Sequence, residues 1–177
     1  NSVPKTWHRL TGWSATIALG PILTPFRFNL MENPRLKALQ QAIGKPFTHS
    51  PSPFGRWLNG EVVAASERSV SFAFTVREEM TNPAGMLHGG VISGMIDDCM
   101  GVTFFVLGLD YFYPSINLNV EFFKGAKEGD KIIVRTQVIK QGRTIINIKA
   151  DVWSEAETLL ASATSNLAVS NIRIPTP

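Results

Sequence analysis

The stretch NPAGMLHGGVISGMIDDCMG, residues 82–101, combines a helical pattern with residues that weaken helices. It contains five glycines, one histidine, two adjacent aspartates and the single cysteine of the chain. Glycine in a helix interior costs about 1 kcal/mol relative to alanine. Several glycines beside an acid in one predicted helix therefore need an explanation other than helix stability.

A helical wheel divides the predicted helix, from about residue 90 to just before residue 108, into two faces. The apolar face is expected to pack on a sheet. It consists of Ile92, Met95, Ile96, Cys99, Thr103 and Val106. The opposite face lacks side chains around one carboxylate, so another chain or a ligand could approach the helix backbone. It consists of Gly90, Gly94, Asp97 and Gly101. Asp98 lies about 100° from Asp97 on the wheel, and we expect it to be a solvated neighbour.

Two interpretations of this glycine face stay open, a close-packed contact between two chains or a functional site. An acid at the centre of such a contact would lose its water, which favours a functional role. His88, Gly89 and Gly90 mark the helix N-terminus, where free N–H groups and the helix dipole stabilise a developing oxyanion. Asp97 lies about two turns further along, too far to act on the same carbonyl. A second subunit could bring its own carboxylate to that position.

The rest of the chain predicts an α+β fold, with one long helix over a curved antiparallel sheet. A main domain is expected at residues 59–172, with two strands before the helix and four after it in a meander. The four later strands are SINLNVEF, KIIVRTQVIK, TIINIKADVW and LLASATSNLAV. Their polar faces and the free sheet edges favour self-association.

Residues 1–58 are expected to form an N-terminal extension that packs on the main domain. Seven of the 11 prolines lie there, which argues against long regular elements. Asn33 and Pro34 predict the start of one helix that ends before Gly44. The remainder is expected to be extended.

Composition excludes several classes of protein. The net charge is +3 and the basic residues are scattered, so we expect no nucleic-acid partner. No apolar run approaches the roughly 20 residues that span a bilayer, so no membrane insertion is expected. One cysteine excludes an internal disulfide framework, and with no evident signal-peptide pattern a cytoplasmic protein is expected. No acid, histidine or cysteine cluster has metal-ligand spacing, and Ser93 lacks the glycines of a nucleophile elbow.

The arrangement resembles the hotdog-fold thioesterases, in particular their PaaI-like branch. In the motif of residues 82–98, asparagine lies six residues before histidine, two glycines follow it, and an acid lies nine residues after it. The resemblance covers about residues 60–170 and extends to YPSINLNVEFFKGAKEGD, residues 113–130. It implies a thioester hydrolase that splits an acyl-CoA into free acid and coenzyme A.

The resemblance also implies roles for individual residues. The Gly89 N–H would polarise the thioester carbonyl, and Asn82 would stand near that carbonyl or the nucleophile. Asp97, supplied across a dimer interface, would act as general base on water or attack directly. Ser115 would help position the attacking water, although a strand-opening serine that faces solvent is the alternative. His88 would orient the loop, with a role as base as the alternative.

Substrate binding is assigned by the same resemblance to Gly90, Lys124 and Arg143, the two cations facing the coenzyme A phosphates. Either cation could instead be an ordinary solvated charge. No separate cofactor is expected, because coenzyme A is part of the substrate. The expected assembly is a homodimer, or a tetramer built as a dimer of dimers.

Two other functions stay open at this stage. One is a hotdog dehydratase of hydroxyacyl thioesters, which usually needs a histidine with an acid in a different motif. The other is a non-catalytic acyl-CoA binding or regulatory module, which would not require Asp97. The sequence does not identify the acyl group.

Overall fold

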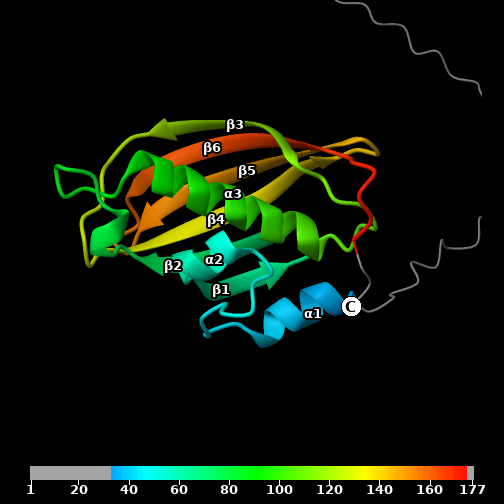
Figure 1. Cartoon of the computed structure of the whole chain (residues 1–177), viewed down its shortest axis with the longest axis horizontal. Coiled ribbons are helices and arrows are strands. Elements are labelled where there is room, and N and C mark those ends of the chain that lie inside the picture. Colours follow the sequence, from blue (N-terminus) through cyan, green and yellow to red (C-terminus); the bar gives the residue numbers. More distant parts are fainter. Residues whose placement is uncertain (1–32, 175–177) are drawn as a thin grey trace, which may run out of the picture. The chain divides into compact units, whose positions relative to one another are not determined.

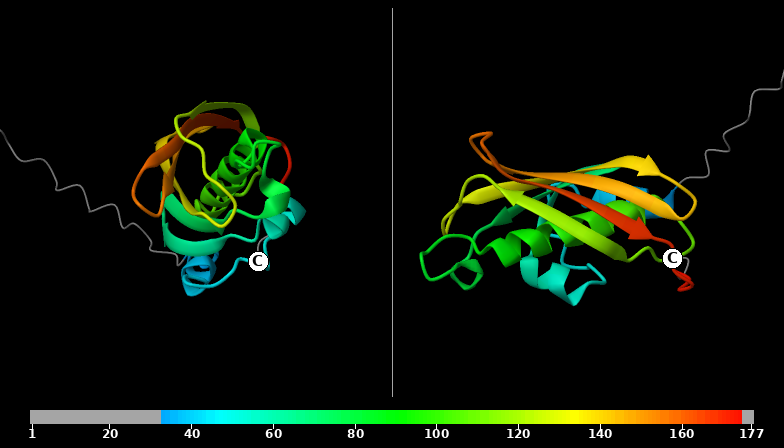
Figure 2. Two further views of the ribbon diagram at one scale, coloured as in Figure 1. Left: turned by 90° about the vertical axis from the view of Figure 1, so that its left-hand side faces the viewer. Right: turned by 90° about the horizontal axis from the view of Figure 1, so that it is seen from above.

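The computed structural model describes residues 33–174, which form an antiparallel sheet curved around one long helix (Figures 1 and 2). The chain order is α1 (Pro34–Gln41), α2 (Pro53–Leu58), β1 (Glu61–Ser66), β2 (Ser69–Thr75), the 3-10 turn η1 (Glu78–Met80), α3 (Gly89–Val106), β3 (Ser115–Phe122), β4 (Lys131–Gln141), β5 (Ile145–Ser154) and β6 (Leu159–Ala168). This is the predicted α+β architecture.

Helix α3 packs on the sheet through the face that the wheel predicts. All six residues assigned to that face are buried, with Met95, Ile96 and Val106 fully inaccessible. Among the helices of the described residues, α3 alone is long and apolar enough to cross a membrane. Its apolar side chains instead form the core with the strands, and burial of apolar surface is the main stabilising contribution to such a fold.

The strand order corrects part of the prediction. The sheet runs β1-β2-β4-β5-β6-β3, with every neighbouring pair antiparallel. Strands β4, β5 and β6 form the expected meander. The prediction that β3 begins this meander is wrong, because β3 pairs with β6 at the far edge of the sheet. The reason is that the chain crosses the concave face of the sheet as α3 before β3 begins, so β3 arrives at the opposite edge (Figure 1).

The two edges of the sheet differ. The edge at β1 is covered by the preceding segment, since Gly44 donates to the Val62 carbonyl at 2.8 Å and Phe47 donates to the Gly60 carbonyl at 2.8 Å. No segment among residues 33–174 pairs with the outer edge of β3 in the same way. Its free N–H and C=O groups make β3 the edge that can accept another strand.

The described part of the N-terminal extension contains one predicted helix and one that was not predicted. As expected, Asn33 caps α1 and Pro34 occupies its first turn. Helix α2 begins in the same way, with Ser52 as cap and Pro53 in the first turn, where an extended segment was predicted. Leu58 of α2 joins the buried core, and the predicted boundary at residue 58 stays a prediction. Residues 1–32 of the extension lie outside the described residues.

Candidate functional site

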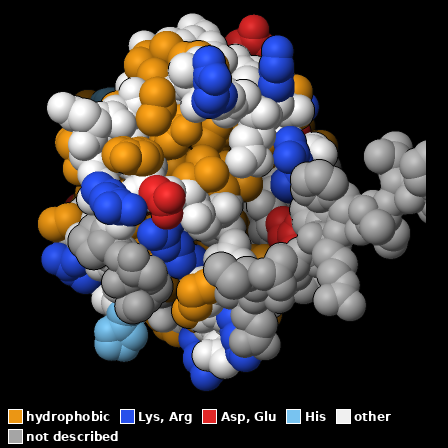
Figure 3. All heavy atoms as spheres, turned by 90° about the vertical axis from the view of Figure 1, so that its right-hand side faces the viewer, with side chains coloured by type: hydrophobic (Ala, Val, Ile, Leu, Met, Phe, Trp, Pro, Cys, Tyr) orange, Lys and Arg blue, Asp and Glu red, His pale blue; other side chains and the backbone are white. Residues whose placement is uncertain are grey.

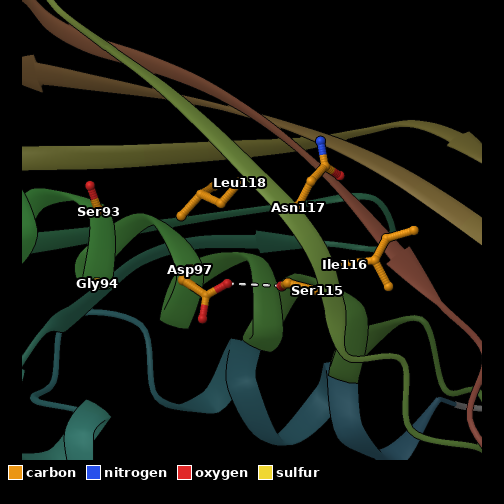
Figure 4. Close-up of a pocket in the computed structure, with 7 residues that line it drawn as sticks. All are labelled: Ser93, Gly94, Asp97, Ser115, Ile116, Asn117 and Leu118. Carbon is orange, nitrogen blue, oxygen red and sulfur yellow. Dashed lines mark hydrogen bonds between the residues drawn. The ribbon is translucent and has the colours of Figure 1, made fainter.

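Ser115 and Asp97 meet between β3 and α3. The Ser115 hydroxyl donates a hydrogen bond of 2.8 Å to Asp97 Oδ1, and the two side chains point toward one another (Figure 4). A β-bulge between Ser115 and Asn117 produces this orientation. Simple alternation places both residues on one face, but the bulge turns Ser115 toward the helix while Asn117 points away.

A pocket of about 400 Å³ lies around this pair, open to solvent. Its lining comes from α3 and the start of β3: Ser93, Gly94, Asp97, Ser115, Ile116, Asn117 and Leu118. Asp97 is exposed there, so its carboxylate can meet water and a ligand. The pocket therefore combines a carboxylate, a hydroxyl and apolar walls in one place.

The N-terminus of α3 leaves one donor free. His88 is the N-cap, and its Nδ1 accepts a hydrogen bond of 2.9 Å from the Gly90 N–H. The Gly89 N–H has no acceptor within residues 33–174. A Cβ on Gly89 would lie 3.3 Å from the Phe122 ring, so a side chain there requires this exposed ring to shift by a few tenths of an ångström. The geometry gives His88 an orienting contact and leaves the Gly89 N–H as a free donor at the positive end of the helix dipole.

Asn82 organises the loop that leads to α3. Its Oδ1 accepts hydrogen bonds from the N–H groups of Ala84, at 2.9 Å, and Met86, at 3.2 Å. Gly85 completes this turn with a φ of +70°, a conformation that glycine adopts at little cost. In a single chain Asn82 therefore shapes the loop, and its predicted position near the reacting carbonyl stays a prediction.

Gly89 and Asp97 are separate within one chain. They are eight positions apart, which at about 1.5 Å per residue is roughly 12 Å along the helix. One thioester carbonyl cannot reach both groups of the same helix. The structure thus brings Asp97 and Ser115 together but not Asp97 and Gly89.

Comparisons with known proteins point to one family. Residues 84–161 match the family model described as the thioesterase superfamily. Over this stretch, which is 78 of the 177 residues, the chain is similar to the thioesterase superfamily. This similarity supports the predicted thioester hydrolase activity. A curated relative, human acyl-coenzyme A thioesterase 13, is 28% identical over 95 residues, which are 54% of this chain and 68% of the relative.

Solved structures confirm the fold of this chain. The E. coli PaaI protein superposes with a TM-score of 0.69 at 14% identity, over 81% of this chain and 99% of that one. A Streptococcus mutans protein, solved bound to acetyl-CoA, gives a TM-score of 0.61 at 22% identity, over 66% of this chain and 92% of that one. The hotdog fold implied by the resemblance is therefore correct.

Part of the glycine face is packed against another segment of the same chain. A Cβ on Gly94 would lie 2.6 Å from the Phe54 ring, so helix α2 packs directly on this glycine. Gly101 has no atom near the position of a Cβ, and Gly90 meets only the His88 ring. At Gly94 the space predicted for another chain or a ligand is therefore partly taken by α2 of the same chain, although Gly94 also lines the open pocket.

Asp98 is not the solvated neighbour that was predicted. It is half-buried against α2, where a Cβ on Gly55 would lie 2.7 Å from Asp98 Oδ2. Burial raises the pKa of the Asp98 carboxyl, and the nearby Asp97 charge raises it further, while a hydrogen bond with Ser52 lowers it. The helical wheel missed this contact because α2 was not predicted. The pair Ser52-Pro53, a favoured helix start, was the signal for it.

Lys124 and Arg143 lie at opposite ends of β3. Lys124 lies two residues after the end of the strand at Phe122. The Arg143 carbonyl accepts a hydrogen bond of 3.1 Å from Tyr113, just before the strand. Both cations are exposed. A single chain therefore does not bring them together, and their predicted contact with phosphates stays a prediction.

Proposed function

We propose that this protein is an acyl-CoA thioesterase in which Asp97 activates water against a carbonyl held by Gly89 of a second protomer. The observation that carries the proposal is the 2.8 Å hydrogen bond from Ser115 to Asp97 at the wall of an open pocket. A general base must lie within hydrogen-bond reach of its proton donor, and a hydroxyl held on the base can accept a hydrogen bond from the same water.

The proposed reaction needs no group beyond the substrate and water. The water oxygen attacks the thioester carbonyl carbon, and its proton passes to the Asp97 carboxylate. The carbonyl oxygen becomes an oxyanion that accepts a hydrogen bond from the Gly89 N–H, a donor without another partner in residues 33–174. The intermediate then expels the coenzyme A thiolate, which takes the proton from Asp97. The products are the free acid and coenzyme A.

Self-association is part of the proposal. Because Gly89 and Asp97 lie roughly 12 Å apart on one helix, a complete site requires two chains. The free outer edge of β3 is the surface we propose for that contact. Two antiparallel copies of β3 would also place Lys124 of one protomer near the Arg143 end of its partner.

The end of the molecule where β3 begins supports this assembly. Apolar side chains gather there, with lysines and arginines around them (Figure 3). Among the exposed apolar residues, Ile116 of β3 is 60% exposed. Exposed apolar groups beside an unpaired strand favour association with a partner strand. We also keep the cytoplasmic location and the tetramer as proposals.

The test is release of free thiol from a panel of acyl-CoA substrates of different acyl length. The proposal expects turnover by the wild-type protein and its loss in Asp97→Asn. Binding of acyl-CoA without turnover by a correctly folded protein would contradict it and would favour a binding module. Release of water from a hydroxyacyl-CoA, with no free thiol, would favour a dehydratase.

A further inference from the structure

An exposed pair of aromatic rings flanks the pocket. Phe54 and Trp57 of α2 stack with ring centroids 5.6 Å apart and planes inclined by 23°. Their exposed fractions are 44% and 40%, although large aromatic side chains are usually mostly buried. The Phe54 ring packs on Gly94, which lines the pocket together with Asp97. An exposed apolar surface thus begins within one helical turn of the proposed base.

Helix α2 is held in this place at both of its ends. At its start, the Asp98 carboxylate lies against Gly55 and interacts with Ser52. At its end, Arg77 donates to the carbonyl groups of Trp57, at 2.7 Å, and Leu58, at 3.1 Å. A helix of six residues is too short to be stable alone, so these contacts set its position.

We propose that Phe54 forms a wall of the acyl-binding site, and that Asp98 is a positioning residue that holds α2, and with it this wall, against α3. The inference rests on the proposed function and specifies its substrate class as thioesters with an apolar acyl group. A chain that leaves the carbonyl beside Asp97 and passes Gly94 meets the Phe54 ring. Burial of each methylene against that ring is favourable, whereas an acetyl group is too short to gain from it.

The first test measures binding without turnover, so that it does not depend on catalysis. The probes are S-octyl-coenzyme A, a thioether that cannot be hydrolysed, and coenzyme A itself. In Phe54→Ala we expect the Kd for S-octyl-coenzyme A to rise about tenfold relative to that for coenzyme A. Ile139→Ala, an exposed apolar residue on β4, is the matched control and should leave the ratio of the two Kd values unchanged. An unchanged ratio of the two Kd values in Phe54→Ala would overturn the proposal that Phe54 forms a wall of the acyl-binding site.

The second test measures kcat/KM for octanoyl-CoA relative to acetyl-CoA. We expect Asp98→Ala to lower this ratio, because α2 loses the side chain that positions it against α3. We expect Asp98→Asn to restore the ratio, because an amide oxygen still accepts a hydrogen bond from Ser52. Loss of a merely structural contact would lower both activities together. A wild-type ratio in folded Asp98→Ala would overturn the positioning role.

The two proposals fail in different ways. If no acyl-CoA releases thiol with the wild-type protein, the proposed function fails, while the binding test still decides on Phe54. A second copy of the chain is the competing occupant of the Phe54 surface. If light scattering shows that Phe54→Ala dissociates into monomers, the ring belongs to the interface between two copies of the chain. That result would overturn the proposal that Phe54 forms a wall of the acyl-binding site.

Discussion

The Ser115 hydroxyl donates to the Asp97 carboxylate across the gap between β3 and α3, at 2.8 Å. This bond requires a bulge at the start of β3, and it holds the proposed base beside the one sheet edge that the described residues leave open. The chemistry and the assembly of this protein are therefore expected to depend on the same strand.

Asp97→Asn should lower kcat by roughly 10²–10⁴-fold, the usual contribution of a general base. The amide keeps the volume of the side chain but cannot take a proton from water. Binding of substrate should survive, because the acyl group loses no attraction. Asp98→Asn, the adjacent and chemically identical change, should retain turnover. Equal losses in the two variants, measured by thiol release, would contradict the assignment of the base.

Ser115→Ala should lower kcat by about tenfold or more while KM changes little, because the base and the water lose a shared hydrogen-bond partner. Ser162→Ala is the matched control. It removes a hydrogen bond of the same kind, from Ser162 to Asp151 at 2.7 Å between β6 and β5. If both serine variants keep wild-type kcat, Ser115 is only a solvated strand residue.

A site shared between two chains predicts complementation. Gly89→Pro removes the proposed oxyanion donor at the first position of α3, where proline is well tolerated, and the extended His88 before it suits a proline. Gly89→Pro and Asp97→Asn should each be nearly inactive alone. Co-expressed, they should regain activity, since mixed dimers combine an intact Gly89 with an intact Asp97.

Two results would contradict the shared site. The first is a stable monomer by light scattering at micromolar concentration with full activity. The second is a mixture of the two variants that stays as inactive as its components although mixed dimers form. Co-purification of two differently tagged chains verifies that mixed dimers are present.

The raised pKa of Asp98 makes stability depend on pH. Its folded-state pKa lies above the ordinary value of 3.8, so the folded state binds the proton more tightly. The contribution of Asp98 to stability is therefore complete below that value and is lost as pH rises through the folded-state pKa. Thermal unfolding across this range should show Asp98→Asn gaining stability relative to wild type with rising pH.

Asp97→Asn is the control background for this measurement. Burial is the largest cause of the shift and the Asp97 charge a smaller one, so most of the pH dependence should persist there. A stability difference that is flat with pH would place Asp98 in a solvated position, and a difference that falls would mean that folding lowers the pKa of Asp98.

Cys99→Ala should leave turnover nearly unchanged and lower the free energy of unfolding by about 1 kcal/mol. The side chain is 1% exposed on the sheet side of α3, and burial raises the pKa of its thiol. In the native protein the thiol should therefore react with a thiol reagent only on unfolding. Rapid reaction, or loss of activity in a folded variant, would mean that the faces of α3 are assigned wrongly.

The helix, its buried face and most of the strands could be predicted because they depend on local periodicity. A repeat of about 3.6 residues selects the side of α3 that carries Cys99 and Met95, and a repeat of two selects the strands. The motif from Asn82 to Asp97 also predicted the family, since its spacing is a property of the chain alone.

The position of β3, the direction of Ser115 and the surroundings of Asp98 were decided by the tertiary structure. Each depends on a segment distant in sequence. Strand β3 pairs with β6 instead of β4, a bulge against β6 turns Ser115 to Asp97, and α2, about 40 residues upstream, buries Asp98. A pattern of neighbouring residues indicates which face of an element is apolar. It does not show which distant segment packs on the other face.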